Sequence, residues 1–108
     1  MISVLRNRKG INYMREKILD KLNNEYELFF LKTMSSTKEF IFSHSYEIEM
    51  KKNITSFLKN EITKNKKITL LKMETSNGII EEFYRYVTDH KEISFEKAMK
   101  EYLKNYLD

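Results

Sequence analysis

The sequence predicts an all-α protein, a compact bundle of about five short helices. The chain has no Pro and only two Gly, Gly10 and Gly78, so it is short of the residues that tight hairpins need. Apolar residues recur at three- and four-residue steps along several segments, which is the period of an amphipathic helix. With 108 residues, 41% of them hydrophobic and 33% charged, the chain has the size and balance of one globular domain.

The first predicted helix covers residues 14–33, and a second helix is expected to begin directly after it. The apolar stripe of the first helix consists of Met14, Ile18, Leu22, Tyr26, Phe29 and Phe30. Ser36 and Glu39 then have the spacing of a capping box, in which each side chain bonds the backbone amide of the other residue. The periodicity of the second stretch falters at "EMKKN", so we expect a break near residues 50–53, with Asn53 capping a new helix.

The middle of the chain contains its clearest turn. The segment "KNKKITLLKME" is interpreted as a short helix, with a strand as the alternative, because no second strand is available to pair with it. The turn "TSNG" follows, and a helix is predicted over residues 77–88. Ser94 is the expected N-cap of the last helix. The predicted core comprises Ile18, Leu22, Phe29, Ile41, Ile48, Leu58, Leu71, Ile80, Phe83, Val87, Met99 and Leu103.

Composition excludes several classes of chemistry. The chain has no Cys, so disulfides, thiolate nucleophiles and zinc–cysteine sites are excluded. The sequence contains no run of about 18 apolar residues, so no membrane span is predicted. At the N-terminus the basic residues follow the short apolar stretch, whereas in a signal peptide they precede it. The expected location is therefore the cytoplasm, with no membrane partner.

The net charge of +4 is concentrated near the N-terminus. Arg6, Arg8 and Lys9 precede Met14 with no acidic residue among them, and removing these three charges leaves +1. If the gene has AT-rich codon usage, the codons for residues 8–10 form a purine run similar to a bacterial ribosome-binding sequence. This run lies three codons upstream of the codon for Met14. The hypothesis is therefore that residues 1–13 are a flexible basic leader upstream of a natural start at Met14, with residues 14–108 as the helical domain. The alternative is a basic arm that contacts phosphate.

No motif in the sequence supports catalysis or cofactor binding. His44 lies one turn from Glu47, but one His and one Glu are too few ligands for zinc. His90 adjoins Asp89 in a predicted loop, where a cap or a surface position is the usual role. With two glycines the phosphate-binding loops are excluded, and no HExxH or GxSxG is present. We therefore expect a protein that is not an enzyme and that holds no metal or cofactor.

Nucleic-acid binding is one interpretation of the lysine-rich middle segment. Its candidate residues are Lys59, Lys64, Lys66, Lys67 and Lys72. The segment "TLLKMETSNGIIEEFYRY" also has the pattern helix, turn, helix, which would make residues after Gly78 a recognition helix. Glu81 and Glu82 argue against that role, because they occupy the early turns where phosphates would be met. A solvated lysine face is the alternative.

Protein binding is the other interpretation, and it rests on the aromatic residues. Seven Phe and seven Tyr exceed what a small helical core must hold, and exposed aromatic side chains are enriched in interfaces. Tyr86 lies on the opposite side of its helix from Phe83 and is predicted to be exposed. The candidate partner-binding residues are Tyr46, Tyr84, Arg85 and Tyr86. An exposed apolar stripe could also pair two copies into a symmetric homodimer.

Three segments, "ILDKLNNEY", "IFSHSYEIEMKKNI" and "LLKMETSNGIIEEFYRYV", resemble successive blocks of a family of small bacterial domains of unknown function. That family is associated with plasmids, prophages and conjugative elements, and the resemblance covers most of residues 14–103. Ser45 and Gly78 stand where the family typically has Ala and Pro. The resemblance implies an all-helical fold and no catalytic residue. It also implies a phage or mobile-element setting, in which small proteins often bind a host defence effector as anti-CRISPR or anti-restriction inhibitors.

Overall fold

A computed structural model describes the backbone of residues 2–65 and 67–107, and the side chains of residues 12–65 and 67–107. Six α-helices and one 3-10 helix make up the described chain, and no strand lies within it. The elements are α1 (Ile2–Met34), α2 (Lys38–Ser43), α3 (Ser45–Lys64), α4 (Leu70–Thr75), α5 (Ile79–Asp89), α6 (Phe95–Leu103) and η1 (Lys104–Tyr106). The predicted all-α class is therefore confirmed.

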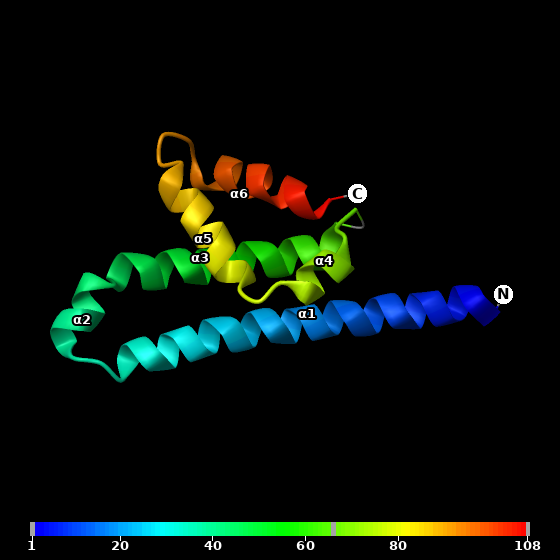
Figure 1. Cartoon of the computed structure of the whole chain (residues 1–108), viewed down its shortest axis with the longest axis horizontal. Helices are drawn as coiled ribbons and strands as arrows, with labels where there is room; N and C mark the ends of the chain where they lie inside the picture. Colours follow the sequence, from blue (N-terminus) through cyan, green and yellow to red (C-terminus); the bar gives the residue numbers. More distant parts are fainter. Residues whose placement is uncertain (1, 66, 108) are drawn as a thin grey trace.

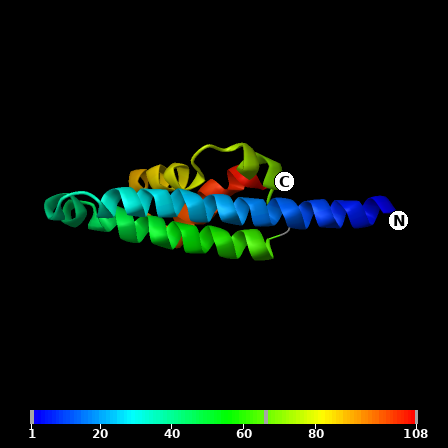
Figure 2. The same ribbon diagram turned by 90° about the horizontal axis from the view of Figure 1, so that it is seen from below.

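Two long helices form the frame of the molecule. Helices α1 and α3 run antiparallel and side by side, and α2 joins them at one end (Figures 1 and 2). Helices α4 and α5 pack against this pair, and α6 folds back against α5 (Figure 1). Because the first turns of α1 extend beyond the rest of the bundle, the molecule is elongated, with extents of 58, 32 and 19 Å.

Helix α1 is longer than the sequence predicted. The expected start at residue 14 is wrong, because α1 begins at Ile2 and continues through Met14 without a break. The described backbone of the expected leader is therefore helical, and the division of the chain into a leader and a domain at Met14 stays a prediction. The side chains of Arg6, Arg8 and Lys9 lie outside the described residues, so the phosphate-binding alternative stays a prediction.

The predicted boundaries of the next two helices are also wrong. Thr37, not Ser36, is the N-cap of α2, and its Oγ1 accepts a hydrogen bond from the Phe40 amide at 3.2 Å. The break falls at His44, and α3 runs without interruption through residues 50–53. The reason is that Lys51 is buried, so it continues the inward-facing stripe of α3 at the point where the apolar pattern of the sequence is interrupted.

The C-terminal elements follow the sequence closely. The segment after Ile68 is helical, as expected, and Ile68 makes only an isolated antiparallel bridge to Leu107. The turn at residues 76–78 separates α4 from α5. Ser94 is the N-cap of α6, and its hydroxyl oxygen accepts from the Lys97 amide at 3.2 Å. Local capping chemistry therefore fixes the start of α6.

One core joins all the longer helices. The buried apolar side chains are Ile18, Leu22, Ile54, Leu58, Ile62, Ile68, Met73, Ile79, Ile80, Phe83, Val87, Ala98, Met99, Leu103 and Tyr106. Of the predicted core, Phe29, Ile41 and Ile48 are only partly buried. Leu71 is 60% exposed, so its assignment to the core is wrong. Helix α4 has a single buried residue, Met73, and Leu71 lies two positions away, toward the other side of the helix.

The buried tyrosine at the C-terminus gives a first prediction, on alkaline stability. The Tyr106 hydroxyl donates to a Glu82 carboxylate oxygen, and burial together with that hydrogen bond raises the pKa of Tyr106. Because the folded state favours the neutral phenol, its contribution to stability is complete below about pH 10 and is lost as the pH rises further. We expect the free energy of unfolding, measured by urea titration, to fall above that pH. The free energy of unfolding of Tyr106→Phe should fall less steeply with pH than that of the parent chain. An equal slope in both proteins would contradict the prediction.

Candidate protein-binding surface

Exposed apolar side chains gather at the end of the molecule where α2 joins the two long helices. Of nine large hydrophobic side chains exposed in the described part of the chain, seven lie between residues 28 and 46. This group, here called the apolar end, consists of Leu28, Phe30, Leu31, Met34, Phe40, Phe42 and Tyr46. The last turns of α1, all of α2 and the first turn of α3 carry it (Figure 1).

An open hollow of about 430 Å³ lies beside the apolar end. The lining residues come from all three helices and are Met34, Lys38, Ile41, Phe42, Ser45 and Ile48. Helix α2 has no fully buried residue, because six residues at the tip of a helical hairpin have little to pack against. The Phe42 ring is 83% exposed, the largest exposed fraction among the large apolar side chains described.

Short-range contacts hold α2 in this position. The rings of Phe40 and His44 stack with centroids 3.8 Å apart, and His44 Nδ1 lies 2.8 Å from the Phe40 carbonyl oxygen. His44 thus terminates α2 and begins α3. No ion pair joins His44 to Glu47, whose carboxylate instead binds Lys51 at 2.8 Å. The role of His44 here is structural.

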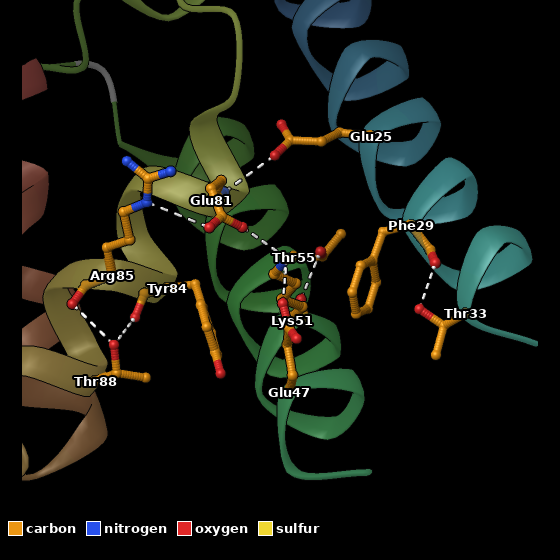
Figure 3. Close-up of polar contacts among 10 residues, drawn as sticks. All are labelled: Glu25, Phe29, Thr33, Glu47, Lys51, Thr55, Glu81, Tyr84, Arg85 and Thr88. Atoms are coloured by element: carbon orange, nitrogen blue, oxygen red, sulfur yellow. Dashed lines mark hydrogen bonds and ion pairs between the residues drawn. The ribbon is translucent and has the colours of Figure 1, made fainter. Parts of the chain in front are cut away.

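Next to the apolar end, Lys51 joins three helices in one charged cluster (Figure 3). Its ammonium lies 2.8 Å from Glu47 of α3 and 2.7 Å from Glu81 of α5. It also lies over two aromatic rings, at 4.0 Å from the Phe29 centroid and 5.2 Å from that of Tyr84. The side chain is only 8% exposed. The two carboxylates and the two ring faces offset the cost of burying the ammonium, because all four attract a cation.

The pKa values of this cluster show which partners dominate. Burial lowers the pKa of Lys51, but the hydrogen bonds and charges of its two glutamates outweigh burial and raise it overall. For Glu81 burial raises the pKa, and the hydrogen bonds and charges of Lys51 and Arg85 bring it below its ordinary value. Glu25 of α1 accepts from the Glu81 amide at 3.1 Å, which ties α1 to the start of α5.

The four predicted partner-binding residues do not share one surface. Tyr46 is 52% exposed and belongs to the apolar end. Tyr84 is partly buried beside Lys51, while the Arg85 side chain is exposed and pairs with Glu81 at 3.3 Å. The expected exposure of Tyr86 is wrong. Its hydroxyl donates to Glu101 at 2.9 Å, because α6 folds back over that side of α5.

Most of the apolar end was not predicted from the sequence. Leu28 and Leu31 lie off the apolar stripe predicted for the first helix. Phe30 was assigned to that stripe, but it is 37% exposed. A signal was available, since two leucines three residues apart share one helix face that should otherwise be polar. Phe42 had no comparable signal, because the exposure of α2 depends on where the hairpin places it.

The lysines proposed for nucleic acid lie mainly on the surface. Lys64, Lys67 and Lys72 are exposed, Lys59 is partly buried, and Lys66 lies outside the described residues. Lys72 Nζ is 3.5 Å from the Asn105 carbonyl oxygen. Helix α5, the alternative recognition helix, buries one face in the core. Its buried residues are Ile79, Ile80, Phe83 and Val87.

Two further kinds of site can be checked in the described part of the chain. Within it, no three acidic or His side chains come together to hold a metal ion. None of the helices searched is both long and apolar enough to cross a membrane. Comparisons with protein-family models, curated proteins and solved structures yield no match to this chain. The family resemblance of its three segments therefore stays a prediction.

Proposed function

We propose that the protein is a non-enzymatic protein-binding inhibitor whose working surface is the apolar end. The observation that carries the proposal is the concentration of exposed rings and aliphatic chains there, led by Phe42. Contiguous apolar patches of several hundred Å² usually mark interaction sites, and aromatic side chains anchor such contacts. The hollow beside Phe42 offers a place for an apolar side chain of the partner.

The proposed mechanism is occlusion without turnover. Apolar side chains bind by excluding water, so this surface would block whatever part of the partner it covers. The proposed target is a host defence effector of the CRISPR or restriction type. The resemblance of three segments to domains of mobile elements supports that choice. It suggests the genetic setting of the protein and identifies no contact with a target. A cytoplasmic location belongs to the same proposal, and the absence of Cys is compatible with it.

The test is capture from a bacterial host lysate, with nuclease and several hundred millimolar salt in the washes. We expect one protein to be retained by the parent chain and by Leu71→Ala, but not by Phe42→Ala. Leu71 is the matched control, because it is 60% exposed on α4, away from the apolar end. The activity of the captured effector should then fall in proportion to added chain.

Two results would overturn the proposal. Equal capture by both variants would show that the apolar end is not the working surface. Recovery of nucleic acid alone, lost on adding salt, would favour the alternative, a DNA- or RNA-binding accessory protein. In that case Lys64, Lys67 and Lys72 should account for a log-linear fall of affinity with salt.

A further inference from the structure

The apolar end has a protruding side chain next to a hollow that could receive the same side chain. Phe42 projects into solvent, and its residue also lines the hollow, together with Met34, Ile41 and Ile48. A two-fold contact repeats one patch on both copies, so each copy must offer both the protrusion and the recess. The apolar end fulfils this requirement within a single short helix and its neighbours.

Two unpaired charges of opposite sign flank the protruding ring. Lys38 and Glu39 precede Phe42 by four and three residues on α2, so both lie on the same side of the helix as the ring. Lys38 lines the hollow. Neither residue forms an ion pair within the described chain, whereas Lys51, Arg85 and Lys100 each form one. A partner would therefore meet a cation and an anion side by side.

We propose that the apolar end binds the same end of a second copy, forming a two-fold symmetric dimer. The Phe42 ring of each copy enters the hollow of the other and contacts Met34, Ile41 and Ile48 there. Because Glu39 lies one turn before Phe42, this insertion brings the Glu39 of each copy to the Lys38 of the other. The dimer thus has two reciprocal ion pairs at the rim of an apolar centre.

The exposed area is that of a modest contact. Scaled by their exposed fractions, the seven side chains of the apolar end present on the order of 600 Å², spread over three helices. A standard interface buries about 800 Å² on each partner, and the flanking Lys38, Glu39 and Ser45 add to the apolar share. The expected dimer is reversible and not obligate, because each copy has its own complete core.

This inference goes beyond the proposed function and does not depend on it. If the same end also binds a target, the second copy and the target compete, and dilution releases the binding surface. The dimer would then act as a reserve of inhibitor with its apolar end covered. A covered end also protects exposed rings from nonspecific association.

Sedimentation velocity on the purified chain tests the proposal directly, from low to several hundred micromolar. The parent chain and Leu71→Ala should shift from monomer to dimer as concentration rises, and Phe42→Ala should stay monomeric. Circular dichroism of each variant checks that the fold is retained, which is expected because Phe42 contributes little buried area. A parent chain that stays monomeric throughout would overturn the inference, even if it still captures a target.

Exchanging the charges of Lys38 and Glu39 provides a more specific test. Recovery of association on mixing two variants cannot result from a folding defect in either one. Lys38→Glu alone and Glu39→Lys alone place like charges opposite each other, so each should self-associate about tenfold more weakly. In a mixture of the two variants, Glu39 of the Lys38→Glu chain faces Lys38 of the Glu39→Lys chain. The two substituted side chains, which also have opposite charges, face each other as well. The mixture should therefore form the dimer again. A mixture that associates no better than its components would overturn the proposed pairing.

Discussion

Replacing Lys51 by alanine is expected to lower the free energy of unfolding by about 3 kcal/mol. The ammonium is buried among two carboxylates and two rings, so its removal leaves Glu47 without a cation and Glu81 with the exposed Arg85 alone. It also opens a gap between Phe29 and Tyr84, because the aliphatic stem of a lysine packs as well as its charge. A domain of this size is stable by only about 5 to 15 kcal/mol, so the loss is large.

Two companion variants separate charge from packing at Lys51. Lys51→Met keeps most of the stem between the rings and should recover part of the loss. Lys52→Ala, an exposed neighbour on the same helix, is the matched control and should change stability by less than about 0.5 kcal/mol. Urea unfolding measures all three. If Lys51→Ala and Lys52→Ala were equally stable, the cluster would contribute nothing.

The same cluster should respond to acid in a defined direction. Because the pKa of Glu81 is lowered in the folded protein, its contribution is present above about pH 4.5 and is lost as the pH falls through the folded value. The parent chain should therefore lose stability on acidification more steeply than Lys51→Met, in which Glu81 has lost its main cation. Parallel curves for the two proteins would contradict this assignment.

Replacing Phe83 by alanine is expected to cost about 3 to 5 kcal/mol, the largest effect of any single substitution considered. Phe83 is fully buried on α5, the helix that packs against α1, α3 and α6. Its ring meets Tyr102 edge-on at 4.7 Å and stacks on Tyr106 at 6.0 Å. Truncation would therefore leave a cavity where the C-terminal helices join the frame, and would remove two aromatic pairs.

Urea unfolding of Phe83→Ala and Phe83→Leu checks this prediction. Leucine fills part of the cavity and should recover a substantial part of the loss, whereas Tyr46→Ala, half-exposed at the apolar end, should be close to neutral. The near-ultraviolet circular dichroism of the tyrosines should weaken in Phe83→Ala. A loss under about 1.5 kcal/mol would show that the site collapses around the missing ring.

Local signals in the sequence determined the C-terminal half well. The Ser94 cap, the turn at residues 76–78 and the stripe through Ile80, Phe83 and Val87 are all where the sequence placed them. Each depends on residues within four positions of one another, so neighbouring chemistry is enough to specify it. The all-α class followed for the same reason, from helical periodicity in a chain almost without Gly and Pro.

Tertiary structure alone decided the positions that depend on distant partners. Lys51 is buried because Phe29 and Glu81, which are distant in the sequence, pack around it. Because Lys51 is buried, α3 continues without a break through residues 50–53. Tyr86 is covered because α6 returns across it, and Leu71 is exposed because no element covers its side of α4. The apolar end has the same origin. Its side chains are apolar like those of the core, and only the path of the hairpin leaves them without a neighbour, since periodicity identifies a face but not what packs against it.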